Sequence, residues 1–240
     1  MHIDILAFAA HPDDAELGCA GILYKAKQQG YTTGICDLTQ GELGTRGTPE
    51  IRQKEAEKAK EILQLDLRIN AKFRDGFFNL DEYHIRKIIE IIRTYTPTLL
   101  LVNAPEDRHP DHGKACRLVK EAAFLSGLQR IETVVEGTVQ KAHRPEKIYS
   151  YIQDKYLEPD IVVDITDVWA IKQKAILAYQ SQFYNPNSNE PQTYISTPHF
   201  LQAVVARAQE MGHKIYADYG EGLIAHQKTG ITKIQSLFLY

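Results

Sequence analysis

The sequence predicts an α/β protein, a Rossmann-like three-layer sandwich built around a mostly parallel sheet. Short apolar runs alternate with longer amphipathic segments through the first half of the chain, as in strand–helix–strand units. The apolar run at 98–103 (TLLLVN) is continuous, which is typical of a strand covered on both faces. No repeat or linker divides the 240 residues, so we expect a single domain over 1–240. In such a sheet the active site lies at the C-terminal edge of the strands.

The elements of the first half follow from their patterns. We expect strands at 3–9, 31–38, 69–73 and 98–103, and helices at 15–29, 49–63, 82–95 and 111–126. The helix at 49–63 has the clearest beginning, with Thr48 as its N-cap and Pro49 at its first position.

The pattern is looser after residue 127. We expect strands at 147–152, 161–165 and 222–226, helices at 167–180 and 199–211, and a surface loop rich in Asn and Pro at 183–198. This loop is a candidate lid, with Tyr184 or Tyr194 reaching a ligand. We favour a surface loop whose tyrosines are buried.

Composition excludes several classes of protein. The 28 basic and 31 acidic residues give a net charge of −3 without long runs of one sign, which argues against nucleic-acid binding. Cys19, Cys36 and Cys116 are too few and too far apart for a disulfide framework or a CxxC zinc site. The chain shows neither a signal peptide nor a membrane-spanning stretch, so we expect a cytoplasmic protein without a membrane partner.

Chemically active residues follow two of the predicted strands. The first strand leads into AAHPDDAELGCAG (9–21), and the strand at 98–103 leads into EDRHPDH (106–112). Both segments should emerge at the same edge of a parallel sheet and meet there. Histidines and carboxylates can bind a hydrolytic zinc, and neighbouring ones can move protons. Turn and helix-cap roles are the alternative, and chemistry alone does not assign the individual residues.

The two motifs also resemble a known family. AHPDDAELGCAG is similar to the first signature of the LmbE-like, or PIG-L, family of zinc-dependent N-deacetylases, and HPDHGKA (109–115) is similar to the second. The resemblance implies that His11, Asp14 and His112 bind one zinc ion per subunit. It implies that Asp13 is the general base, and that His109 polarises the amide carbonyl or protonates the leaving amine.

Two points around this site stay open at the level of sequence. Fe²⁺, Co²⁺ or Mn²⁺ can use the same ligands as Zn²⁺. Asp111 is a candidate for orienting a histidine by hydrogen bonding, although a carboxylate in the first turn of a helix needs no such role.

A third segment, QGELGTRGTPEIR (40–52), follows the second strand and should lie at the same edge. Its Arg46 and Arg52, together with Arg108, could bind the carboxylates of a substrate, or each could pair with a neighbouring acid. The segment resembles the family members that act in bacillithiol biosynthesis. That resemblance implies N-acetylglucosaminyl malate as the substrate, whose malate carboxylates the arginines would bind.

The sequence therefore predicts a zinc amidohydrolase that deacetylates a small N-acetylglucosamine conjugate. Alternatives are a deacetylase of another acetylated sugar such as a chitin oligosaccharide, a non-catalytic metal-binding protein, and a Rossmann-like nucleotide-binding protein. The last would carry a glycine-rich fingerprint where this chain has HPDD. We also expect a homo-oligomer of unspecified size.

Overall fold

The computed structural model describes residues 1–228 and 230, and these contain a seven-stranded sheet with the order β3-β2-β1-β4-β7-β9-β8. The strands are β1 (Ile5–Ala9), β2 (Thr33–Thr39), β3 (Leu67–Phe73), β4 (Leu99–Val102), β7 (Lys147–Tyr151), β8 (Ile161–Asp164) and β9 (Gly220–Ala225). The pairs from β3 to β7 are parallel, whereas β9 runs antiparallel to both of its neighbours. The predicted mostly parallel sheet is confirmed.

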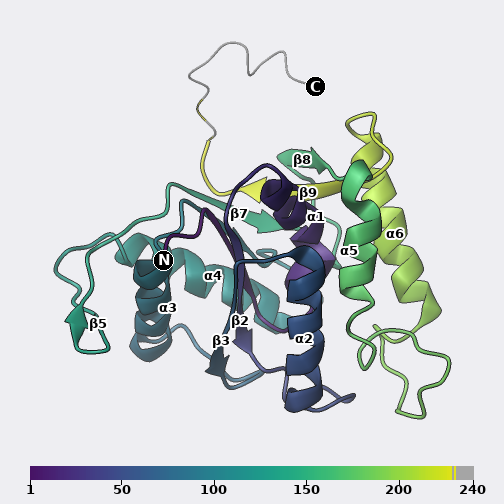
Figure 1. Ribbon diagram of the computed structural model, residues 1–240, viewed down its shortest axis with the longest axis horizontal. Helices are drawn as coiled ribbons and strands as arrows, with labels where there is room; N and C mark the ends of the chain where they lie inside the picture. Colours follow the sequence, from purple (N-terminus) through teal and green to yellow (C-terminus); the bar gives the residue numbers. More distant parts are fainter. Residues whose placement is uncertain (229, 231–240) are drawn as a thin grey trace.

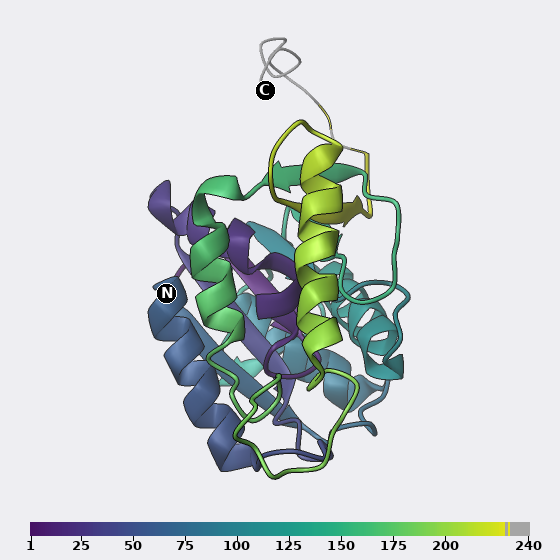
Figure 2. The same ribbon diagram turned by 90° about the vertical axis from the view of Figure 1, so that its right-hand side faces the viewer.

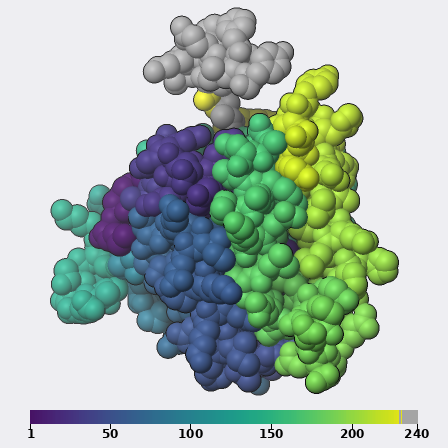
Figure 3. Space-filling view, turned by 45° about the vertical axis from the view of Figure 1, so that its right-hand side comes forward, coloured from purple at the N-terminus to yellow at the C-terminus, as the bar shows by residue number. Residues whose placement is uncertain are grey.

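Helices cover both faces of this sheet (Figure 1). One face carries α3 (Glu82–Tyr95) and α4 (Pro110–Leu125), and the other carries α1 (Asp14–Gln28), α2 (Pro49–Leu63), α5 (Trp169–Ile176) and α6 (Pro198–His213). Figures 2 and 3 show α2, α5 and α6 side by side on the outer surface of the second face. The three layers are those predicted for this class of fold.

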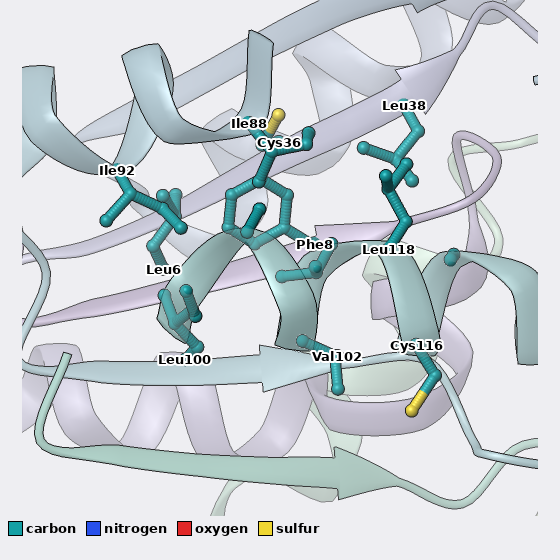
Figure 4. Close-up of a cluster of buried hydrophobic side chains, with 14 of the residues drawn as sticks. Leu6, Phe8, Cys36, Leu38, Ile88, Ile92, Leu100, Val102, Cys116 and Leu118 are labelled. Atoms are coloured by element: carbon teal, nitrogen blue, oxygen red, sulfur yellow. The ribbon is translucent and has the colours of Figure 1, made fainter. Parts of the chain in front are cut away.

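The alternation of side chains along β1 decides which core each residue enters. Leu6 and Phe8 point toward α3 and α4, where Figure 4 shows them with Ile88 and Ile92. The two alanines of β1, Ala7 and Ala9, pack on the opposite face against α1. Both faces of β1 are therefore buried, which explains the continuous apolar run in its sequence.

Several helix ends match the predictions. Helices α2 and α3 have the predicted bounds, and the Thr48 hydroxyl accepts a hydrogen bond from the Ile51 backbone at 3.3 Å as the predicted N-cap. The predicted loop at 183–198 is confirmed up to Thr197, the N-cap of α6. No helix in the described part of the chain is long and apolar enough to cross a bilayer.

The helix predicted at 167–180 is wrong in its extent. A 3₁₀ turn, Thr166–Val168, comes first, and α5 ends at Ile176. Tight turns follow the end of α5. They place the Tyr179 side chain in the core, where its hydroxyl donates a hydrogen bond to the Glu16 carboxylate at 3.1 Å.

A small hairpin of β5 (Val134–Val135) and β6 (Thr138–Val139) was not predicted. Its two-residue turn, Glu136 and Gly137, has positive φ at both positions. The turn signal was present in the sequence as EG between two valine-rich pairs.

An ion pair buried between two elements supports a kink in α1. The helix is interrupted at Cys19, and this frees backbone groups that must find other partners. The Glu221 carboxylate accepts from the backbone N–H groups of Gly21 and Ile22, at 2.9 and 2.7 Å. Lys172 donates to Glu221 at 2.6 Å, and both side chains are at most 4 % exposed. This pair joins β9 and α5 to α1.

We therefore expect Lys172→Met to lower the free energy of unfolding by about 3 kcal/mol, because it leaves the Glu221 carboxylate buried without its cation. Lys25→Met is the matched control, since Lys25 pairs with a mostly exposed Asp167, and should cost less than about 1 kcal/mol. Urea unfolding measures both values. Equal losses would contradict the role given to the buried pair.

Candidate active site

The segments that follow β1 and β4 meet at the C-terminal edge of the sheet, as the topology predicts. These two strands are neighbours, and the order of the strands reverses between them, which is where α/β proteins bind ligands. A cavity of about 340 Å³ opens at this point. Its walls include the histidines and aspartates of both motifs: His11, Asp13, Asp14, His109 and His112.

The Asp14 carboxylate lies between two of these histidines. Its Oδ1 is 3.1 Å from Nε2 of His112, and its Oδ2 is 3.5 Å from Nδ1 of His11. All three residues are buried, with Asp14 only 3 % exposed. Residues separated by almost one hundred positions thus present three possible metal ligands to one point.

In both histidines, a carboxylate lies close to the ring nitrogen that does not face Asp14. Nδ1 of His112 is 2.6 Å from Asp107, and Nε2 of His11 is 3.0 Å from Asp75 and 3.5 Å from Asp111. Metal-binding histidines nearly always have such a partner on the nitrogen that does not face the metal, because it fixes the ring and its tautomer. Asp111 therefore lies where it can orient a histidine, the role for which the sequence made it a candidate.

Asp75 and Asp107 are site residues that the sequence analysis missed. Asp107 lies within the quoted segment EDRHPDH, next to residues that were selected. Asp75 follows β3, so the same rule about strand ends that selected the other segments would have found it.

His109 is the third histidine of the cavity. Ring nitrogens of His11, His109 and His112 lie within 4.8 Å of one another. The His109 side chain also caps α4, because its Nδ1 accepts from the Asp111 backbone at 3.3 Å. Burial and the two neighbouring imidazoles lower the pKa of His109. A neutral ring in this position carries its proton on Nε2, because Nδ1 accepts the backbone hydrogen bond.

The donor set fits a divalent cation. Burial alone would lower the pKa of His112, but the facing carboxylates of Asp14 and Asp107 raise it to about 9. The surroundings therefore stabilise positive charge between these groups. Histidine nitrogens with a carboxylate oxygen are the ligands that catalytic zinc prefers. A second group, His11, Asp75 and Asp111, lies on the other side of the His11 ring.

Asp13 is held in a strained and buried position. Its φ of 114° is outside the range that suits residues with a side chain, and such strain concentrates at functional sites. Arg52 Nη2 donates to its carboxylate at 3.0 Å and also to the Pro12 carbonyl. Burial raises the pKa of Asp13 to about 7, although the Arg52 charge acts in the opposite direction.

Gly41 makes room for this arginine. Its φ is +65°, and a Cβ there would lie 1.9 Å from Nη1 of Arg52. The same Nη1 donates to the Gly41 carbonyl at 3.3 Å. Arg52 reaches the cavity wall, but its guanidinium is held by Asp13 and by two backbone carbonyls.

The other two predicted arginines also line the cavity. Arg46 is 5 % exposed and donates from Nη2 to Ser188 at 2.7 Å, and its Nε lies 3.5 Å from the Glu190 carboxylate. Arg108 pairs with Asp154 at 3.2 Å and lies over the Tyr194 ring. Arg207 of α6, which was not predicted, completes the wall.

The loop before α6 contributes to the same wall through Tyr194, whose hydroxyl donates to Asp154 at 3.1 Å. Tyr184 lies outside the cavity wall, and both tyrosines are about half exposed. The prediction of buried tyrosines is therefore wrong.

The chain is similar to proteins of a known family. Residues 6–123 match the family model described as GlcNAc-PI de-N-acetylase (PIG-L). The crystal structure of the conserved protein TT1542 from Thermus thermophilus is similar, with a TM-score of 0.85 and 34 % identity, over 97 % of this chain and 98 % of that one.

Two of the relatives with functional names are deacetylases of acetylated sugars. Diacetylchitobiose deacetylase of Thermococcus kodakarensis is 28 % identical over 189 residues, which are 75 % of this chain and 70 % of that protein. Probable N-acetyl-alpha-D-glucosaminyl L-malate deacetylase 2 of Bacillus subtilis is 28 % identical over 199 residues, 76 % of this chain and 84 % of that protein.

We expect the metal-free protein to take up one equivalent of Zn²⁺ and the His112→Ala variant to take up much less, because one of three converging ligands is lost. His84→Ala is the control, since His84 also meets a carboxylate, Asp81 at 2.7 Å, but lies outside the cavity. Metal analysis after dialysis measures the uptake. Equal zinc content in both variants would exclude His112 as a ligand.

Proposed function

The chain belongs to the PIG-L family of de-N-acetylases, and we propose that it removes the acetyl group from an N-acetylglucosamine conjugate. The observation that carries the proposal is the buried Asp14 carboxylate between His11 and His112, with carboxylates behind both rings. We propose these three residues as the ligands of a zinc ion. When bound, zinc would polarise the acetyl carbonyl and lower the pKa of water in the cavity.

Asp13 is the proposed general base. It lines the same cavity as the proposed ligands, and Arg52 fixes its carboxylate. It accepts a proton from the water that attacks the acetyl carbon. Asp13 or His109 then gives a proton to the departing nitrogen, so that acetate and a free amine result.

His109 is the proposed stabiliser of the developing oxyanion. Its neutral ring keeps a proton on Nε2, because Nδ1 accepts from the backbone of α4. A donor aimed at the acetyl oxygen becomes more favourable as that oxygen gains negative charge. The cap on α4 fixes the ring before the substrate enters.

The substrate that we propose carries an anionic group beside the amino sugar, as N-acetylglucosaminyl malate does. Arg46 supports this choice, because it lines the cavity, is almost fully buried, and pairs with an acid, Glu190, only at the long distance of 3.5 Å from its Nε. Arg108 is a second candidate for the same anion. The relative from Bacillus subtilis supports a malate conjugate, whereas the relative from Thermococcus kodakarensis favours a neutral chitin fragment as the alternative.

We also propose a single domain over 1–240 and a homo-oligomer. One apolar cluster packs against α1, and a second packs against α5 and α6. Both include contacts with Tyr24, Ile62 and Val163, which supports one continuous core on the face of the sheet that these helices cover. Large apolar side chains of the second half, such as Phe124 and Leu177, are more than half exposed, which supports self-association.

We expect Asp13→Asn to lower kcat for acetate release by about 100-fold or more, because a proton acceptor is lost. Its zinc content should stay near one equivalent. Asp167→Asn, which changes an exposed carboxylate far from the cavity, is the control. An Asp13→Asn enzyme with the kcat of the unmodified protein would remove Asp13 from the mechanism.

A second test concerns the substrate. Arg46→Gln should raise KM for N-acetylglucosaminyl malate by about tenfold or more, since a charged hydrogen bond to a carboxylate is lost. KM for N,N′-diacetylchitobiose should change little. Steady-state acetate release with both substrates decides the matter, and equal changes in KM would argue against an anionic group at Arg46.

A further inference from the structure

Two buried amides contact the Asp14 carboxylate and take no part in the proposed chemistry. Asn103 follows β4 and Gln153 follows β7, so both lie at the edge of the sheet that forms the cavity. Asn103 Nδ2 donates to Asp14 Oδ2 at 3.0 Å, and Gln153 Nε2 donates to Asp14 Oδ1 at 2.9 Å. Asn103 is fully buried, and Gln153 is 4 % exposed.

The two amides also hold each other. Asn103 Nδ2 donates to Gln153 Oε1 at 2.8 Å, and Asn103 Oδ1 accepts from the Ala10 backbone at 2.9 Å. A flipped Asn103 amide would place N–H against N–H at Ala10, so its orientation is fixed. The Asn103 backbone is held as well, because the Ser150 hydroxyl donates to its carbonyl at 2.8 Å.

These contacts make the two oxygens of Asp14 unequal. Oδ2 accepts from the His11 backbone at 2.9 Å as well as from Asn103, so both of its lone-pair directions are used. Oδ1 accepts only from Gln153 among the amides, and its remaining side faces Nε2 of His112. Oδ2 also lies 3.5 Å from Nδ1 of His11, so Oδ1 is the oxygen with a lone-pair direction left for a cation beside His112.

We infer that Asn103 and Gln153 form an amide clamp that positions Asp14 so that Oδ1 alone serves as a metal ligand. This inference rests on the proposed metal site. Neutral donors suit the task, because they fix the carboxylate without cancelling the charge that attracts the cation. Loss of a hydrogen-bond partner behind a ligand typically weakens metal binding by about 10–100-fold.

Gln153→Met tests the clamp, since it keeps the length of the side chain and removes both hydrogen bonds. Competition with a chromophoric chelator, using the metal-free protein and Zn²⁺ alone, should show Kd raised by about tenfold or more. Gln140→Met is the matched control, because Gln140 donates to Glu90 and Thr94 away from the cavity. Its Kd should not change.

A purely structural role is separated by thermal unfolding with and without Zn²⁺. A bound metal raises Tm by an amount that depends on its Kd. The clamp predicts a smaller zinc-induced rise in Gln153→Met than in Gln140→Met. A lower Tm with an undiminished rise would contradict the clamp. If Gln153→Met does not fold, Gln153→Leu serves in both measurements.

The outcomes also separate the clamp from the proposed function. An unmodified protein that binds no Zn²⁺ would overturn both. An unmodified protein that binds Zn²⁺ with the same Kd as Gln153→Met would overturn the clamp alone. Because no substrate is present, a contact between Gln153 and the sugar cannot produce the expected change.

Discussion

A carboxylate removed from water needs compensating donors, and the site depends on how the fold supplies them to Asp14. Asp14 receives the His11 backbone N–H after β1, the Asn103 amide after β4 and the Gln153 amide after β7, while His112 approaches from the start of α4. These three strands are adjacent and parallel, so their carboxyl ends meet at one edge. An antiparallel strand at the position of β4 would place Asn103 at the opposite edge. The parallel arrangement of these strands therefore supplies the hydrogen-bond donors that compensate for the burial of the Asp14 carboxylate.

The two aspartates of HPDD are held differently, and this difference separates their proposed roles. Asp14 is surrounded by neutral amides and histidines, so its charge stays available toward the cavity. Asp13 has a strained backbone and a single full cation, Arg52, beside it. The guanidinium of that arginine occupies space that a Cβ at position 41 would fill. The environment of Asp14 thus suits the binding of a cation, whereas that of Asp13 suits the transfer of a proton.

Much of the fold and the centre of the site were predictable, because they rest on local patterns. Apolar periodicity gave α2 and α3 their bounds, and the two motifs at strand ends selected the residues around Asp14. The rest depends on tertiary contacts. A single amide such as Asn103 or Gln153 at a strand end carries no chemical signature until the carboxylate that it meets is known. Likewise, α5 ends before the predicted residue because the Tyr179 hydroxyl forms a hydrogen bond in the core with Glu16, 163 positions away along the chain.

The central claim is that one cation lies between His11, Asp14 and His112, with Asp14 bound through Oδ1. Anomalous diffraction at the zinc edge, from crystals of the zinc-loaded protein, tests it most directly. The account predicts one peak about 2.0–2.2 Å from Nδ1 of His11, Oδ1 of Asp14 and Nε2 of His112. A peak on the opposite side of the His11 ring, bound by Asp75 and Asp111, would contradict it.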